Sequence, residues 1–196
     1  MTRLKIHILV LDGVFDMGLA AVLDAFGVAN TVAEMTGVSS LRFETKVLGL
    51  RKTITTAQGL GMAVAVAAKA EPPDVVMPAI GKMQPGPLVE ALTSGEVRGA
   101  GAMLRKWSQG GAVISTACVG TFVLAEAGLL DGEEATTTWW LAPLFRQRYP
   151  EVRLDETRLI VPSNRVVTAG SALSHLDLAL TLIRRASREL ANLTAK

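Results

Sequence analysis

Short apolar runs alternate along the chain with longer stretches of helical spacing. Residues 4–11 form a nearly continuous run of branched apolar side chains, which is typical of a strand buried on both faces. Residues 17–35 place apolar side chains on one helix face. The same reading predicts strands at 41–50, 74–80, 112–115, 153–161 and 165–169, and helices at 86–95, 96–109, 119–130 and 171–193.

Strands that alternate with helices predict an α/β fold with a mostly parallel central sheet and helices on both faces. The segments 153–161 and 165–169 fit a strand pair joined by a turn at residues 162–164. The chain contains no internal repeat, low-complexity tract or linker, so we expect one domain over residues 1–196. Ligands of such sheets sit beyond the carboxyl ends of the strands, which makes the residues just after strands the candidates for function.

Composition narrows the class of protein. The 196 residues are 49% hydrophobic and 19% charged, which excludes a disordered chain, and the positive mean hydropathy predicts an apolar dimer face. No apolar run approaches the roughly 20 residues of a membrane helix, and the N-terminus lacks a signal-peptide pattern. A single cysteine favours a reducing cytoplasm. The formal charge of +2 is too small to indicate nucleic-acid binding.

The only cysteine, Cys118, lies between the strand at 112–115 and the helix at 119–130, with Gly120 two residues later. This pattern predicts a strand–turn–helix elbow in which the free N–H groups of the helix favour a thiolate. The backbone N–H groups of Val119 and Gly81 are candidates for an oxyanion hole. The alternative is a buried cysteine that acts as a small hydrophobe, with Gly81 in an ordinary turn.

Two histidines and two tryptophans are the remaining candidates. His7 lies within the first strand and is expected to be a packed or partly exposed strand residue. His175, near the start of the last helix, is the one histidine placed to approach Cys118, and the alternative is a surface or dimer-face residue. Trp139 is a candidate wall of the ligand pocket, and at least one of Trp139 and Trp140 is expected in the core. No cluster of His, Cys and carboxylates has metal-ligand spacing, so we expect neither a metal nor a cofactor.

The elbow and its continuation, residues 114–139, resemble the ThiJ/PfpI superfamily, whose fold is class I glutamine amidotransferase-like and flavodoxin-like. Residues 14–20, 24–30 and 168–180 resemble in particular the amino-terminal sensor domain of AraC-type transcription regulators. The resemblance implies a three-layer sandwich with a nucleophile-elbow cysteine. It also implies a small-molecule effector, a homodimer, and contact with DNA only through a C-terminal helix-turn-helix module.

The chain departs from the catalytic members of the superfamily at several positions. Proteolytic members carry histidine immediately after the cysteine, where this chain has Val119, and many relatives carry histidine at the position of Thr138. Hydratase- and amidase-like members place an acid where this chain has Gly18, with Asp16 two residues earlier. A cysteine without a base or an orienting acid is a poor nucleophile for acyl transfer.

The sequence therefore predicts a ligand-sensing domain of an AraC-like regulator that binds a small metabolite at a pocket around Cys118, Gly81 and Val119 and lacks efficient catalysis. The alternative is a cysteine-dependent hydratase or amidase in which Cys118 attacks and Asp16 moves protons, and a third possibility is a sensor in which Cys118 is oxidised to a sulfenic acid. No helix-turn-helix pattern remains unassigned, so we expect either an excised sensor domain or a stand-alone relative.

Overall fold

The computed structural model describes residues 2–196, with Pro78 described by its backbone alone. A seven-stranded sheet with the order β10-β11-β7-β6-β1-β2-β5 forms the centre of the molecule. Its pairs are parallel except for β10 against β11. The strands of this sheet are β1 (Thr2–Val10), β2 (Leu41–Gly49), β5 (Ala65–Val66), β6 (Val75–Ala79), β7 (Val113–Ala117), β10 (Ile160–Ser163) and β11 (Val166–Ala169).

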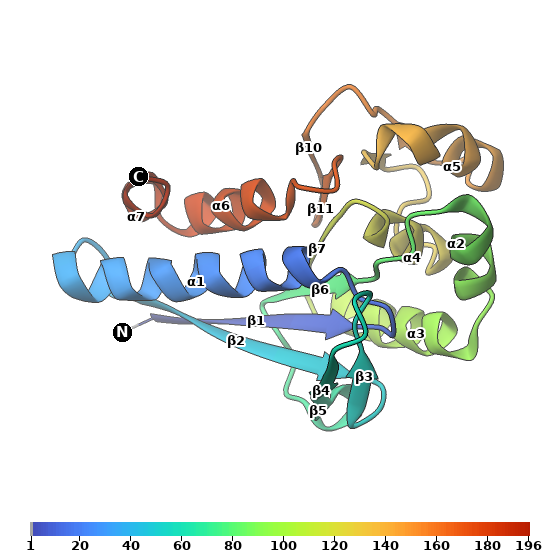
Figure 1. Cartoon of the computed structure of the whole chain (residues 1–196). Coiled ribbons are helices and arrows are strands. Elements are labelled where there is room, and N and C mark those ends of the chain that lie inside the picture. Colours follow the sequence, from blue (N-terminus) through green and yellow to red (C-terminus); the bar gives the residue numbers. More distant parts are fainter. Residues whose placement is uncertain (1) are drawn as a thin grey trace.

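Helices cover both faces of the sheet and complete three layers. Helices α1 (Asp16–Thr36), α6 (His175–Ala186) and α7 (Arg188–Thr194) pack together, and α6 lies against β7 and β11. Helices α2 (Pro85–Leu92), α3 (Gly95–Gln109) and α4 (Gly120–Glu126) form the second helical layer, in which α3 and α4 contact β6 and β7. Figure 1 shows α1 and α6 side by side, with the two chain ends at the same end of the molecule. The predicted α/β sandwich with a mostly parallel sheet is confirmed.

The apolar runs of the sequence form the hydrophobic core. The second half of β1, from Ile6 to Val10, is buried throughout because layers of helix lie above and below it. Helix α1 buries one stripe, which includes Leu19, Val22 and Phe26. Phe26 also packs against Phe43 of β2 with a ring-centroid distance of 5.0 Å.

Helix α1 has the length and mean hydropathy of a membrane span, which the sequence reading did not anticipate. In this fold it packs against β2, α6 and α7 and buries the stripe just described. We therefore interpret α1 as a core helix of the α/β domain.

Several smaller elements were not predicted. They are β3 (Thr53–Thr55) paired with β4 (Gly61–Ala63), β8 (Glu134–Ala135) paired with β9 (Arg153–Leu154), helix α5 (Ala142–Arg148), and the 3-10 helices Ala67–Lys69 and Trp139–Leu141. The β3–β4 hairpin folds over the end of β1, where the N–H of Gly13 donates to the carbonyl of Thr55 at 2.7 Å. This hairpin brings Ala57 and Gln58 to the carboxyl edge of the sheet.

Three predictions for the carboxyl-terminal third of the chain are wrong in the structure. The strand predicted at 153–161 is interrupted, since only Arg153–Leu154 and Ile160–Ser163 are extended strands. The turn predicted at residues 162–164 is wrong because Pro162 and Ser163 belong to β10, an edge strand that tolerates proline, and the chain turns at Asn164 with φ 49°.

The single helix predicted at 171–193 is divided in two. Helix α6 begins at His175, and Ser187 is extended with φ −155°. The hydroxyl of Ser187 then accepts from the N–H of Leu190 and caps α7. The helix predicted at 119–130 is also shorter, because α4 ends at Glu126 before Gly128 at φ 66°.

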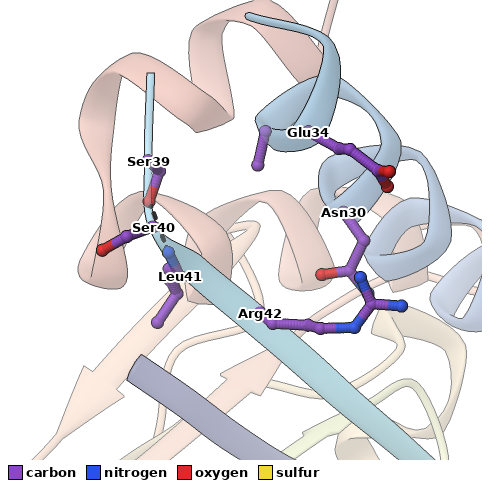
Figure 2. A pocket seen from close by; sticks show the side chains of 7 residues that line it. Asn30, Glu34, Ser39, Ser40, Leu41 and Arg42 are labelled. Atoms are coloured by element: carbon purple, nitrogen blue, oxygen red, sulfur yellow. Dashed lines mark hydrogen bonds between the residues drawn. The ribbon is translucent and has the colours of Figure 1, made fainter. Parts of the chain in front are cut away.

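Strand β2 has an open side over most of its length, because β5 pairs only with Leu48 and Gly49. The side chain of Asn30 covers this side at one position: its Nδ2 donates to the carbonyl of Phe43 and its Oδ1 accepts from the N–H of Phe43, each at 2.8 Å. Asn30 also lines an open cleft of about 450 Å³ between α1 and the start of β2. Figure 2 shows this cleft, with Asn30 and Glu34 on α1 and residues 39–42 leading into β2.

Candidate functional site

Cys118 lies at the junction of β7 and α4 with φ 57°, a left-handed conformation that is uncommon outside glycine. Hydrogen bonds on both sides fix this geometry. The N–H of Cys118 donates to the carbonyl of Ala169 at 2.8 Å, and its carbonyl accepts from the hydroxyl of Thr137 at 2.9 Å. The predicted position of Cys118 at a strained strand–helix junction is confirmed.

The thiol of Cys118 is buried, with 1% of the residue exposed. Burial raises the pKa of the thiol from its ordinary value of 9.0 to about 12, and the N–H of Val119, which donates to the sulfur, offsets this only in part. The expected thiolate is therefore wrong: α4 has only seven residues, and the loss of hydration outweighs its N-terminal N–H groups.

Asp16 begins α1, and its Oδ2 accepts from the backbone N–H of Gln58 at 3.1 Å. This bond ties α1 to the tip of the β3–β4 hairpin. The other carboxylate oxygen of Asp16 is buried without a hydrogen-bond partner among the residues that the structure describes. A catalytic role for Asp16 stays a prediction.

His175 occupies the space beside Gly18, the position at which the resemblance to hydratase- and amidase-like proteins would place an acid. A Cβ on Gly18 would lie 2.6 Å from Nε2 of His175, so any side chain there would displace the ring. The ring lies 5.8 Å from that of Phe15 between centroids, and its Nδ1 is 3.0 Å from the carbonyl of Ala172. Burial lowers the pKa of His175, so the ring is neutral at physiological pH.

His175 and Gly18 line a cavity of about 20 Å³ together with Thr116 and Ala117, the residues that precede Cys118. This volume holds about one water molecule. His175 thus lies near the end of β7, but no hydrogen bond joins its ring to Cys118 within residues 2–196, and its approach to Cys118 stays a prediction. Its part in catalysis stays a prediction.

Gly81 follows β6 and contacts the loop after β1. A Cβ on Gly81 would stand 2.3 Å from the carbonyl oxygen of Gly13 and 2.7 Å from the backbone nitrogen of Phe15, so only glycine permits this approach of the two loops. The suggested pairing of the N–H groups of Gly81 and Val119 in an oxyanion hole stays a prediction.

Trp139 and Trp140 both lie on the surface, and the expectation that at least one of these two is in the core is wrong. Trp139 is 70% exposed and Trp140 is 37% exposed, because the 3-10 helix 139–141 turns both side chains outward while Leu141 is buried. The indole Nε1 of Trp140 donates to the carbonyl of Met83 at 3.2 Å and so holds the loop after β6. A ligand contact of Trp139 stays a prediction.

Buried threonines around the elbow were missed by the sequence reading. Thr121 donates to the carbonyl of Thr136 at 3.0 Å, and the N–H of Thr136 donates to the hydroxyl of Thr168 at 2.8 Å. The hydroxyl of Thr138 is buried without a hydrogen-bond partner in the described part of the chain. The run of three threonines at 136–138 was the available signal, and it holds the segment after α4 against Cys118.

The last candidates are His7 and a possible metal site. His7 is buried and packs edge-on against Trp107 with a centroid distance of 5.8 Å, which confirms it as a packed strand histidine. Burial, together with Lys46 and Lys5, lowers its pKa. Over residues 2–196, no three His, Cys, Asp or Glu side chains are grouped so that they could hold a metal ion.

Comparison with known proteins places these features in context. The DJ-1/PfpI family matches residues 4–185. Among curated proteins, the chain is 37% identical over 83 residues to the HTH-type transcriptional regulator CdhR of Pseudomonas aeruginosa and 32% identical over 80 residues to the HTH-type transcriptional regulator GlxA of Rhizobium meliloti. These alignments cover 42% and 41% of this chain but only 24% of each relative.

Solved structures share the whole fold at low sequence identity. An AraC family transcriptional regulator from Pseudomonas putida has a TM-score of 0.80 and 17% identity, with 98% of this chain and 97% of that chain covered. The oxidized DJ-1 of Toxoplasma gondii has a TM-score of 0.75 and 22% identity, with 98% and 96% covered. At these identities the likeness establishes the fold alone.

Proposed function

We propose, from the premise that this chain belongs to the DJ-1/PfpI family, that it is the ligand-sensing domain of a transcription regulator of the AraC type. The identity to helix-turn-helix regulators supports this proposal. The aligned region is about a quarter of the length of those relatives, so contact with DNA is assigned to a further module of the whole protein. A regulator of this kind acts in the cytoplasm.

The burial of the Cys118 thiol, which raises its pKa to about 12, is the observation that supports a sensor over an enzyme. Nucleophilic catalysis needs a thiolate, a proton acceptor for the attack and a donor for the leaving group. Val119 and Thr138 stand at the two positions where related proteins have histidine, and neither transfers protons at neutral pH. The space of the usual acid is taken by the ring of His175 against Gly18.

We expect no efficient hydrolysis by this domain. Loss of general acid–base assistance typically costs about 100- to 10,000-fold for each partner, which leaves turnover near background. The measurement compares the wild-type domain with Cys118→Ala on panels of amides, esters and isocyanides. Robust turnover that Cys118→Ala abolishes would overturn the sensor assignment in favour of the hydratase or amidase.

We also propose that the domain forms a symmetric homodimer. Exposed apolar side chains flank the contact between Gly18 and His175: Leu173 is 64% exposed, Leu176 is 47% exposed and Met17 is 46% exposed. Surfaces of this kind commonly mark interfaces between copies of a soluble protein. The dimer would place the starts of α1 and α6 at its centre.

Sedimentation velocity at tens of micromolar is expected to show a dimer for the wild-type domain and a monomer for Leu173→Glu. Leu60→Glu is the matched control, because Leu60 is also 64% exposed but lies on the β3–β4 hairpin. A wild-type monomer at this concentration, or equal dissociation by both variants, would contradict the proposed interface.

A further inference from the structure

The order of the strands creates a crevice between β1 and β6. The chain moves from β1 to β2 on one side and later from β6 to β7 on the other, so the strand order reverses between β1 and β6. Since crossovers between parallel strands are right-handed, the connections after these two strands leave on opposite faces of the sheet. The loops after β1 and β6 therefore diverge, and open α/β sheets bind their ligands at this point.

A cleft of about 360 Å³ lies at this reversal point, within the usual range for small-molecule sites. The contact between Gly81 and the carbonyl of Gly13 holds the two loops together beside it. The hairpin tip supplies a third wall through Ala57 and Gln58. The complete lining is Gly13, Phe15, Ala57, Gln58, Gly81, Lys82, Met83, Gln84 and Pro87.

Lys82 is the one charged side chain in this lining. Its Cε and Nζ stand 2.9 Å and 3.1 Å from the point where a Cβ on Gly13 would lie, so the ammonium reaches across the cleft onto the loop after β1. No ion pair involves Lys82 in the part of the chain that the structure describes. The cleft therefore presents a positive charge that forms no ion pair among the described residues.

The nearby carboxylate of Asp12 is already neutralised by other groups. The N–H of Thr55 donates to it at 2.9 Å and Arg51 pairs with it, and both lower its pKa, whereas Lys82 contributes last. Asp16 is likewise directed to the backbone N–H of Gln58. Although the other oxygen of Asp16 has no hydrogen-bond partner among the described residues, neither acid forms an ion pair with Lys82.

The rest of the lining suits a small organic molecule with a short apolar part. Phe15, Met83 and Pro87 offer apolar surface, and Gln58 and Gln84 offer side-chain amides. Gln84 is the N-cap residue of α2, but its side chain makes no capping hydrogen bond, which leaves the amide available to a ligand. The indole of Trp140 donates to the carbonyl of Met83, so the share of Trp140 in the fluorescence of the three tryptophans reports on this loop.

We propose that this cleft binds a small organic carboxylate, with the ammonium of Lys82 pairing with the carboxylate and the apolar part of the ligand lying on Phe15 and Met83. The inference rests on the proposed sensor function, since such a carboxylate would be the effector. It places recognition at the β1–β6 reversal point and leaves the sulfur of Cys118 out of direct contact with the ligand.

The experiment measures binding of butyrate, glutarate and phenylacetate to the purified 196-residue chain by calorimetry and tryptophan fluorescence at constant ionic strength. Each acid is compared with its neutral amide, which has the same shape without the charge. We expect at least one carboxylate to bind and its amide to bind about tenfold or more weakly, the difference typical of a hydrogen bond to a charged group. Failure of all three acids to bind, or equal binding of acids and amides, would overturn the proposal.

Lys82→Gln is expected to weaken carboxylate binding about tenfold or more, and Lys82→Arg to retain most of it. Lys52→Gln is the matched control, because Lys52 is also exposed but lines a different cavity. Equal effects of Lys82→Gln and Lys52→Gln would show that the carboxylate is attracted by the overall positive charge and not bound at a specific site. This result would also overturn the proposal. These outcomes are independent of the turnover assay with Cys118→Ala, so failure of the carboxylate site is distinguishable from failure of the sensor function.

Discussion

Iodoacetamide is expected to alkylate native Cys118 about a thousandfold more slowly at pH 7.5 than the same cysteine in the unfolded chain. The thiolate is the reactive form, and a pKa raised from 9.0 to about 12 lowers its fraction by roughly three powers of ten. Burial of the sulfur adds to this protection. Because the chain has one cysteine, the mass of the labelled protein reports this site directly.

The pH dependence gives the control. The native rate should rise about tenfold per pH unit up to about 12, whereas the rate in guanidinium should level off near 9. The folded pKa lies above the unfolded one, so the contribution of Cys118 to stability is complete below pH 9 and is lost as the pH rises towards 12. Cys118→Ala should lack this component. A native rate within tenfold of the unfolded rate at pH 7.5 would show that burial does not suppress the thiolate, and it would favour the enzyme or the redox sensor over the sensor proposed here.

Gly81→Ala is expected to destabilise the domain by about 3 kcal/mol, near the upper end of the range for overpacking. The added Cβ would meet the backbone of Gly13 and Phe15 at 2.3 Å and 2.7 Å, and backbone atoms of two joined loops cannot move aside as a flexible side chain does. Chemical denaturation of the variant measures the loss. The same change should separate the loops after β1 and β6 and weaken any ligand binding between them.

Gly27→Ala is the matched control for that substitution. Gly27 is exposed within α1, and an added Cβ there has no heavy atom within 4 Å. Alanine in an exposed helix interior is favoured over glycine by about 1 kcal/mol, so this variant should be slightly more stable than the wild type. A Gly81→Ala protein as stable as the wild type would contradict the close approach of the two loops.

The sequence predicted the main layers because their patterns are long and local. The apolar run of β1 and the helical stripe of α1 each depend on many residues, so one ambiguous position changes little. The short elements were missed because two- or three-residue strands such as β5 and β8 carry too few positions for a period. Pro162 was misread as a turn residue, since its place on an edge strand depends on the partner β11.

The sequence predicted the position of Cys118 but not the raised pKa of its thiol. The glycines and Cys118 mark the elbow in the sequence, and the structure confirms φ 57° at that residue. The pKa of the thiol depends on how tightly the surrounding helices exclude water, and this is a property of the assembled core that no local motif encodes. The contact of His175 with Gly18 joins residues more than 150 positions apart and was equally invisible.

The side chain of Asn30 has a consequence for the behaviour of the folded protein at high concentration. By donating to and accepting from the backbone of Phe43, it imitates one residue of a neighbouring strand on the open side of β2. Exposed strand edges recruit strands from other molecules, and charged side chains together with local covers are the usual protection. Here Arg42, Glu44 and Lys46 supply the charges along the same strand. The part of β2 that β5 leaves unpaired is therefore protected against edge-to-edge aggregation and fibril growth.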